Sequence, residues 1–163
     1  FLESIRFSPG AVARGVEAIR AKRPIICDVR MLAAGSTHAG EDVICLIQDP
    51  AVVALAKADG ITRAAAAMRH LGDRLAGAIV AIGNAPTALW TVMDMAAQGG
   101  PVPALVVGMP VGFVGAHESK LALSQSALPF ITNLSPRGGS PAAAAAVNAL
   151  ADLARRPATG ESP

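Results

Sequence analysis

The sequence has 163 residues, of which 52% are hydrophobic, 16% are charged and 3% are aromatic, and its formal net charge is +2. This length suits one domain with its own core and is short for two. The small net charge, without a stripe of Lys and Arg interleaved with aromatic residues, argues against a nucleic-acid-binding protein. The mean hydropathy is +0.45, but no uninterrupted apolar stretch approaches the roughly 18 to 20 residues that span a bilayer. We therefore expect a soluble protein that acts neither on nucleic acids nor in a membrane.

The first part of the chain predicts one helix and two short strands. Ser8–Ala21 begins with Ser-Pro and continues with apolar residues at helical spacing, which indicates a helix. Pro24–Val29 and Val43–Ile47 are rich in β-branched residues and are typical of buried strands. The polar stretch Gly35–Asp42 joins these two strands.

Helices and strands alternate through the rest of the chain. The predicted elements, in chain order, are helix Thr62–Leu75, strand Ala78–Gly83, helix Asn84–Gln98, strand Ala104–Gly108, helix Glu118–Ser126, strand Pro129–Asn133 and helix Ser140–Arg155. The strands are continuous apolar runs, as expected where helices cover both faces of a parallel sheet. This alternation predicts a three-layer α/β fold with a flavodoxin-like, doubly wound, mainly parallel sheet of five strands.

Residues 1–156 are predicted to form a single domain, and the polar tail 157–163 is predicted to be disordered. Cys27 and Cys45 lie in apolar runs without CxxC spacing, which is typical of buried, reduced thiols in a cytoplasmic protein. The N-terminus has no positively charged leader followed by an apolar block, so no secretory signal is predicted. Because so little charge is available to cover the surface, we also expect part of it to be buried in a homodimer.

Three predicted strand-to-helix loops are rich in glycine and proline: Gly83–Thr87, Gly108–Gly115 and Ser135–Pro141. In an open α/β sheet the ligand lies beyond the carboxyl ends of the strands, where loops of this kind meet. Glycines allow the backbone to approach a ligand closely. The three loops are therefore the first candidates for a binding site.

The helices that follow these loops are expected to begin at an anion site. Asn84 or Thr87 would cap one helix and Ser140 another, while Arg137 adds a fixed positive charge. Backbone N–H groups left free at each helix start would face the crevice and bind carboxylates or phosphates. The alternative is purely structural, since glycine and proline also end strands and begin helices where no ligand binds.

Thr62 and Arg63 open a predicted helix that is expected to project from the same edge. A guanidinium binds a carboxylate through two parallel hydrogen bonds, although a solvated arginine is the simpler interpretation of the local sequence. His38, His70 and His117 have no partner at the spacing of metal ligands, so no metal site is predicted.

Seven phrases of the sequence carry a resemblance to a known family. They are FSPG at Phe7–Gly10, PIICDVRM at Pro24–Met31, VICLIQDP at Val43–Pro50, TRAAAA at Thr62–Ala67, RLAGAIVAIGNAPTAL at Arg74–Leu89, GMPVGFVGAHESK at Gly108–Lys120 and RGGS at Arg137–Ser140. GNAPTAL and GMPVGFVGA are long and specific, and they occur in this order. Together the phrases resemble the precorrin-8X methylmutase family of cobalamin biosynthesis, whose members act on precorrin-8X or cobalt-precorrin-8.

The resemblance implies a homodimeric, flavodoxin-like isomerase that needs no metal or organic cofactor. Such an enzyme moves a methyl group between adjacent carbons of a corrin precursor rich in carboxylates and yields hydrogenobyrinate or cobyrinate. The resemblance further implies that Arg63 holds a substrate carboxylate. The other residues implied to line the macrocycle pocket are Thr62, Gly83, Asn84, Thr87, Gly108, Gly112, Gly115, Arg137, Gly138, Gly139 and Ser140, with Met31 and Gly35 closing one side.

Two departures from the family pattern bear on activity. The family's general-acid histidine stands before the FSPG phrase, and this sequence begins at Phe1. We therefore assign no catalytic residue within this chain, expect the domain to be incomplete at its N-terminus, and expect the activity of this chain to be severely reduced. The linker Gly35–Asp42 is also a few residues shorter than the family's and lacks an arginine often found there.

Two other functions remain open at this point. A non-catalytic tetrapyrrole carrier would keep the pocket without the acid histidine. A flavodoxin-like protein that binds FMN is disfavoured, because only Trp90 and four phenylalanines are available to stack on an isoalloxazine ring.

Overall fold

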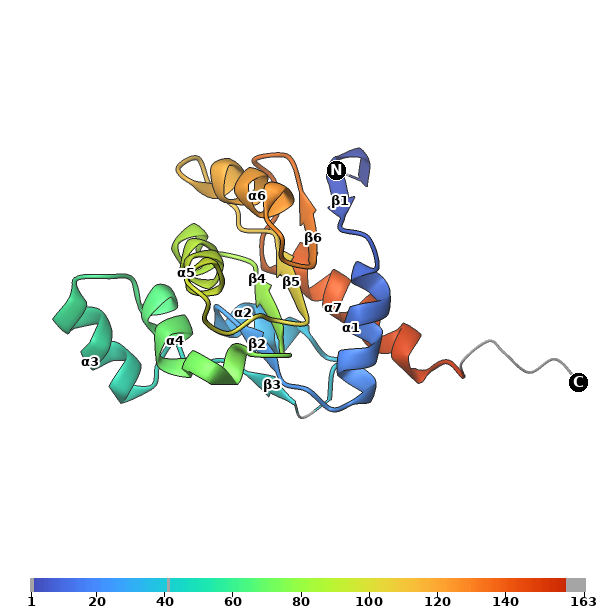
Figure 1. The fold of residues 1–163 in the computed structure, drawn as a ribbon, viewed down its shortest axis with the longest axis horizontal. Helices are drawn as coiled ribbons and strands as arrows, with labels where there is room; N and C mark the ends of the chain where they lie inside the picture. The colour runs from blue at the N-terminus through green and yellow to red at the C-terminus, as the bar shows by residue number, and fades with distance from the viewer. Residues whose placement is uncertain (1, 41, 158–163) are drawn as a thin grey trace, which may run out of the picture.

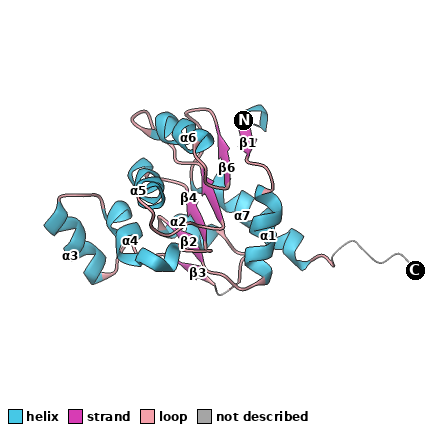
Figure 2. Ribbon diagram, in the orientation of Figure 1, coloured by secondary structure: helices cyan, strands magenta, loops and turns pink. Residues whose placement is uncertain are grey.

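The structure, a computed structural model, describes residues 2–40 and 42–157. Residue 41 of the predicted linker and all but the first residue of the predicted tail 157–163 lie outside the described residues. Within these ranges the chain forms a six-stranded sheet flanked by helices (Figures 1 and 2). The strands are β1 Ile5–Phe7, β2 Ile25–Cys27, β3 Val43–Ile44, β4 Ile79–Ile82, β5 Leu105–Gly108 and β6 Phe130–Asn133.

The sheet is mixed and mainly parallel, with the strand order β1-β6-β5-β4-β2-β3. Strands β2 to β6 are parallel, and β1 pairs antiparallel with β6. Counted among themselves, the parallel strands follow the order 2-1-3-4-5, which is that of the flavodoxin sheet. The predicted α/β class is confirmed, but the predicted number of five strands is wrong. The additional strand, β1, has only three residues, two of them exposed, so it leaves no buried apolar run in the sequence.

The described residues contain seven α-helices and two short 3-10 helices. They are η1 Leu2–Ser4, α1 Ala11–Arg20, α2 Arg30–Gly35, α3 Pro50–Asp59, α4 Arg63–Leu71, η2 Gly72–Leu75, α5 Pro86–Ala97, α6 Ala116–Gln125 and α7 Ser140–Arg155. Helix α7 has the predicted bounds, and the predicted helix 62–75 is α4 followed by η2. Helices α2 and α3 were not predicted. Among the described helices, none combines the length and the apolar character needed to cross a bilayer.

Helix α1 begins three residues after the predicted start at Ser8. Gly10 precedes the helix in the left-handed conformation, with φ 73°, which favours glycine. Ser8 extends the pairing of β1 with β6: its N–H donates to the carbonyl of Phe130 at 3.0 Å, and its Oγ accepts from the N–H of Phe130 at 2.8 Å. Ser8 therefore anchors the edge strand and does not cap α1.

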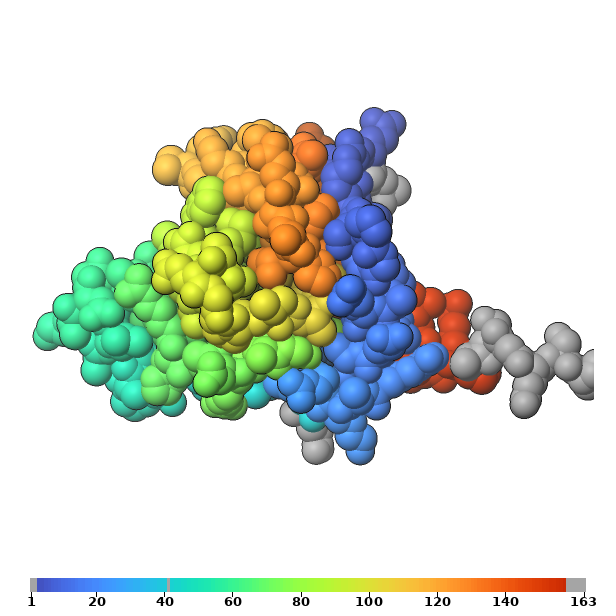
Figure 3. Space-filling view, viewed as in Figure 1, coloured from blue at the N-terminus to red at the C-terminus, as the bar shows by residue number. Residues whose placement is uncertain are grey.

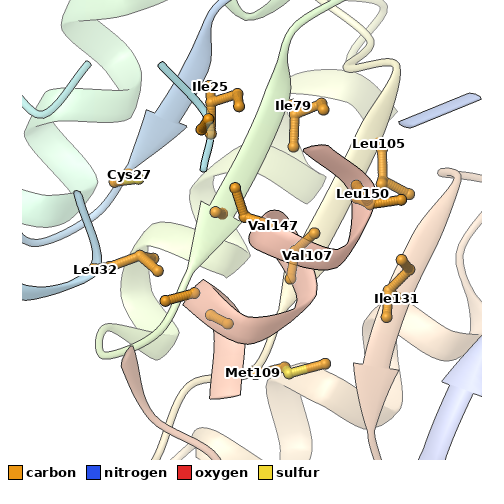
Figure 4. Close-up of a cluster of buried hydrophobic side chains, with 14 of the residues drawn as sticks. Ile25, Cys27, Leu32, Ile79, Leu105, Val107, Met109, Ile131, Val147 and Leu150 are labelled. Carbon is orange, nitrogen blue, oxygen red and sulfur yellow. The ribbon is translucent and has the colours of Figure 1, made fainter. Parts of the chain in front are cut away.

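Two apolar layers hold the helices against the sheet. Helices α1, α2 and α7 cover one face, where Val147 and Leu150 of α7 lie against the strands (Figure 4). Helices α4, α5 and α6 cover the other face. Neighbouring residues of β4 alternate between the layers, since Ile79 packs in the first and Val80 in the second. Each such fully buried side chain stabilises the fold by about 1.5 to 3 kcal/mol, and the arrangement confirms the predicted three layers.

Helix α3 lies at the outer edge of the molecule and packs beside α4 (Figures 1 and 3). The contact is made by small side chains, among them Val52 and Ala56 of α3 and Ala66 and Ala67 of α4. It holds the segment between the two helices, which leads into the start of α4 at the carboxyl edge of the sheet.

Candidate functional site

The three glycine-rich loops meet at the carboxyl edge of the sheet. A Cβ placed on Gly83 would lie 2.7 Å from the Cα of Ser140. The N–H of Gly139 donates to the carbonyl of Met109 at 2.8 Å. The loops after β4, β5 and β6 are therefore in contact with one another, as the sequence led us to expect.

A hollow of about 620 Å³ opens beside these loops, at the carboxyl ends of β2, β3 and β4. Four segments line it: Val29–Arg30, Ile47–Gln48, Thr62–Ala64 and Asn84–Thr87. The strand order reverses between β2 and β4, and ligands of open α/β sheets bind at such switch points. We call this space the switch-point hollow. Its volume falls within the range of about 300 to 1,000 Å³ that is usual for small-molecule sites.

Two arginines line the switch-point hollow. Arg63 is the first residue of α4, and the Oγ1 of the preceding Thr62 caps the helix by accepting from the N–H of Ala65 at 3.1 Å. Arg30 is the first residue of α2, and its Nη1 donates to the Oε1 of Gln48 at 2.9 Å. Because none of the described residues that line the hollow is acidic, the hollow carries two fixed positive charges and suits a polyanion.

Sequence reasoning missed Arg30, although a signal was present. Arg30 follows the strand β2 within three residues, and this short distance places it at the carboxyl edge of the sheet. The six-residue helix α2 was not predicted, so the sequence did not indicate that Arg30 opens a helix at this edge.

Four predicted site residues line the switch-point hollow: Thr62, Arg63, Asn84 and Thr87. The hydroxyl oxygens of Thr62 and Thr87 are 2.7 Å apart and share a hydrogen bond. This bond ties the start of α4 to the start of α5 across the hollow. The remaining predicted residues are not part of its lining and lie in the neighbouring loops, at the end of β5 or on α2 and α7: Met31, Gly35, Gly83, Gly108, Gly112, Gly115, Arg137, Gly138, Gly139 and Ser140.

The N–H groups before α5 are bound by a carboxylate of the protein itself. Asp28, which follows β2 and is wholly buried, accepts from the N–H of Gly83 at 3.0 Å, of Asn84 at 2.9 Å and of Ala85 at 2.7 Å. The prediction that these N–H groups face the crevice is therefore wrong. Neither Asn84 nor Thr87 caps the helix, because Ala85 is the cap residue and its N–H points to Asp28. Burial raises the pKa of Asp28, while the three N–H donors oppose that shift.

The start of α7 also differs from the prediction. Ser140 is the first helical residue, and Gly139, with φ 105°, takes the cap position. Ser140 therefore does not act as the cap, and its backbone lies close to Gly83. Helix α6 likewise begins at Ala116, two residues before the predicted Glu118.

Replacing Gly83 with alanine is expected to destabilise the protein by about 1 to 3 kcal/mol. The new Cβ would meet the backbone of Ser140 at 2.7 Å, so α7 would have to move away from β4. Gly35→Ala is the matched control, because its Cβ would meet only the Cβ of Ala144, at 3.1 Å. Urea unfolding of the two variants measures the difference, and equal losses would argue against a close backbone contact at Gly83.

None of the three histidines, all of which lie in the described part of the chain, lines the switch-point hollow. The Nδ1 of His38 lies 2.9 Å from Asp152 of α7, and His70 and His117 are exposed on α4 and α6. Within residues 2–40 and 42–157, no three side chains of His, Cys, Asp or Glu are grouped as a metal site.

The two cysteines are unpaired, with Cys27 buried and Cys45 half-buried. Burial raises the pKa of Cys27 to about 12, so its thiol is protonated at neutral pH. A protonated, buried thiol is a poor nucleophile, and we assign it to the core.

Fold and site together define a doubly wound α/β protein with a hollow at its switch point that is lined by two arginines. Among solved structures, the chain is similar to precorrin-8X methyl mutase from Thermus thermophilus, with a TM-score of 0.83 and 42% identity over 93% of this chain and 77% of that one. It is also similar to a precorrin-8X methylmutase related protein, with a TM-score of 0.83 and 34% identity over 93% of this chain and 82% of that one.

Similarity in sequence agrees with similarity in structure. Precorrin-8X methylmutase of Pseudomonas aeruginosa is 49% identical over 156 residues, which are 92% of this chain and 75% of that protein. Cobalt-precorrin-8 methylmutase of Methanocaldococcus jannaschii is 42% identical over 149 residues, 91% of this chain and 70% of that protein. The family profile described as precorrin-8X methylmutase matches residues 1–153. The chain therefore belongs to the precorrin-8X methylmutase family, a family of isomerases.

Proposed function

We propose that this protein converts precorrin-8X, or its cobalt-containing form, to hydrogenobyrinate or cobyrinate by moving a methyl group between adjacent ring carbons. One observation of the structure supports this reaction most directly: the switch-point hollow presents two arginines and no acidic lining residue. A corrin precursor carries many acetate and propionate groups, so its rim is complementary to that charge. We infer the reaction from the family to which the chain belongs, and we infer the place of the substrate from the switch-point hollow.

In this proposal Arg63 and Arg30 each bind one carboxylate of the substrate. Both are the first residues of helices that begin at the carboxyl edge, so both project from a fixed backbone. The hydrogen bond from Arg30 to Gln48 uses one of the five guanidinium donors and limits the rotation of the group. Two fixed guanidinium groups would orient an asymmetric ring better than one.

The loop after β5 is proposed to contact the apolar face of the macrocycle. Phe113 and Val114 are 103% and 89% exposed, although both are apolar. Apolar side chains exposed side by side are typical of a binding surface. The loop contacts the start of α7 through Met109 and Gly139, so these side chains lie on the same edge as the arginines.

The methyl shift is an allowed sigmatropic rearrangement, so the protein has to fix the ring conformation and supply a proton to a pyrrole-type nitrogen. The residues of the switch-point hollow perform the first task. The family assigns the second to a histidine whose position has no match in this sequence, and His38, His70 and His117 do not line the hollow. We therefore assign binding and orientation, and not proton transfer, to the described residues.

Conversion and binding are tested separately. The protein encoded by the whole reading frame is incubated with precorrin-8X, and formation of hydrogenobyrinate is followed by its absorption spectrum. We expect conversion without any added metal or organic cofactor. Binding of the product without conversion of the substrate would instead support a non-catalytic carrier. Titration of the 163-residue chain with hydrogenobyrinate tests the hollow alone, and the lack of saturable binding would contradict the proposed site.

We also infer that the protein forms a homodimer through the apolar groove between β1, α1 and α7. This groove has a volume of about 450 Å³, and its lining includes Ile5, Phe7 and Val12 together with alanines of α7. Phe7 is 55% exposed on the edge strand, and a second copy would cover it. Light scattering is expected to give twice the monomer mass, and Phe7→Asp is expected to shift the protein toward the monomer. A monomeric wild-type protein would contradict the dimer.

A further inference from the structure

Lys120 of α6 is a buried cation outside the switch-point hollow. Its residue exposure is 0%. Its Nζ donates to the carbonyl oxygen of Arg137 at 2.7 Å and to that of Ser135, and it lies 3.5 Å from the Oδ1 of Asn133. Among the ion pairs of the described residues, none includes Lys120.

An ammonium group buried without a carboxylate is unfavourable, because it loses its hydration. Burial accordingly lowers the pKa of Lys120 to about 8. An apolar side chain of similar length would fill the same space without that loss. The hydrogen bonds of Lys120 to the loop after β6 must therefore offset the loss of hydration, and they are the specific contribution of a lysine at this position.

The loop after β6 is held from its inner side. Asn133 adds to the lysine by donating from its Nδ2 to the carbonyl of Arg137 at 2.7 Å and to the Oγ of Ser135 at 2.9 Å. The N–H of Gly139 donates to the carbonyl of Met109 at 2.8 Å. The carbonyls of residues 135 and 137 thus point into the protein. The side chain of Arg137 is exposed and stands at the carboxyl edge of the sheet, three residues before α7 begins at Ser140.

We propose that Lys120 is a positioning residue, which turns the carbonyls of Ser135 and Arg137 inward and so fixes the loop that presents Arg137 to an anionic ligand. Lys120 itself does not touch the ligand and acts through Arg137. The inference rests on the proposed function, because the ligand is taken to be a carboxylated corrinoid. The inference adds to the proposed function that ligand binding depends on Lys120, a residue outside the switch-point hollow.

The first test needs no ligand. Lys120→Met removes the donors and keeps an unbranched side chain, and Lys22→Met is the matched control, since Lys22 is exposed at the opposite, amino-terminal edge between α1 and β2. In Lys120→Met, amide hydrogen exchange over residues 135–139 is expected to rise by about tenfold or more through local opening. In the control it should stay unchanged. Unchanged exchange in Lys120→Met would overturn the proposal, whatever the protein binds.

The second test is a double-mutant cycle on the dissociation constant of hydrogenobyrinate. Arg137→Ala is expected to weaken binding by about tenfold in the wild-type protein and by less than about twofold when Lys120 is already methionine. Arg63→Ala should have the same effect in both backgrounds, because Arg63 stands on α4. A full effect of Arg137→Ala in the Lys120→Met protein, or a lost effect of Arg63→Ala, would overturn the proposal.

The two tests separate this inference from the proposed function. If the wild-type protein does not bind hydrogenobyrinate, the proposed function fails, while hydrogen exchange still decides whether Lys120 holds the loop. If Lys120→Met does not fold, Lys120→Gln takes its place in both tests, because its amide keeps donors on a shorter side chain. The same pattern with smaller changes is then expected, and its absence would overturn the role of Lys120.

Discussion

Arg63→Ala is expected to weaken the binding of hydrogenobyrinate by about tenfold to a hundredfold. A hydrogen bond to a charged group contributes roughly 1.5 to 3 kcal/mol, which corresponds to this range of dissociation constants. Arg63 is exposed in the absence of ligand, so the loss should be largest at low salt and shrink as ionic strength rises. Titrations at low and high salt measure both effects.

Arg74→Ala is the matched control for Arg63→Ala. Arg74 is an exposed arginine of η2, the element that precedes β4 and so lies toward the amino ends of the strands. Its replacement should leave the dissociation constant unchanged. Arg30→Ala should weaken binding in the same way as Arg63→Ala, since both side chains line the switch-point hollow. An unchanged dissociation constant in Arg63→Ala would remove Arg63 from the site.

Asp28→Ala is expected to lower the free energy of unfolding by about 3 to 5 kcal/mol, the largest loss of stability among the variants considered. A buried donor left without an acceptor costs roughly 1 to 3 kcal/mol. The substitution takes the carboxylate from the buried N–H of Gly83 and from the partly buried N–H groups of Asn84 and Ala85. Asp28→Asn keeps the size and one carbonyl oxygen, so its loss should be smaller. Urea unfolding ranks the two variants, and a near-neutral Asp28→Ala would show that the loop does not depend on Asp28.

The stability of the wild-type protein should also depend on pH through Asp28. Burial raises the pKa of Asp28 in the folded state above the value of roughly 3.9 in an unfolded chain. Between the unfolded and the folded pKa the folded state binds more protons than the unfolded state. The part of the stability that is linked to protonation of Asp28 is therefore present below the unfolded pKa and is lost as pH rises through the folded pKa, while the hydrogen bonds to the three N–H groups remain. The difference in unfolding free energy between wild type and Asp28→Asn, measured against pH, isolates this slope. No change in that difference with pH would contradict the shift.

Much of the fold could be predicted because the central strands are continuous apolar runs with helices between them. The elements that were not predicted from the sequence are mostly short ones, or ones that form through contacts with distant parts of the chain. Strand β1 has three residues and depends on pairing with β6. Helix α3 did carry a local signal, since Asp49 caps it by accepting from the N–H of Ala51 and Pro50 occupies its first turn.

Parts of the candidate site could be predicted where the position of a residue follows from the local sequence around it. Thr62 and Arg63 stand at a helix start that local sequence identifies, and the structure places both at the switch-point hollow. The loop before α5 was misread because its N–H groups are bound by Asp28, about 55 residues earlier in the chain. The contacts of Lys120 with the loop after β6 are likewise tertiary, and no spacing rule reveals them.

The internal carboxylate of Asp28 has a consequence for how binding preferences can change in this family. Because Asp28 already binds the N–H groups of Gly83, Asn84 and Ala85, we expect discrimination between ligand charges to depend mainly on the arginine side chains at the starts of α2 and α4. Exchanging Arg30 or Arg63 for a neutral residue would therefore retune the hollow toward rings that carry an amide in place of an acid. The scaffold itself would stay as it is.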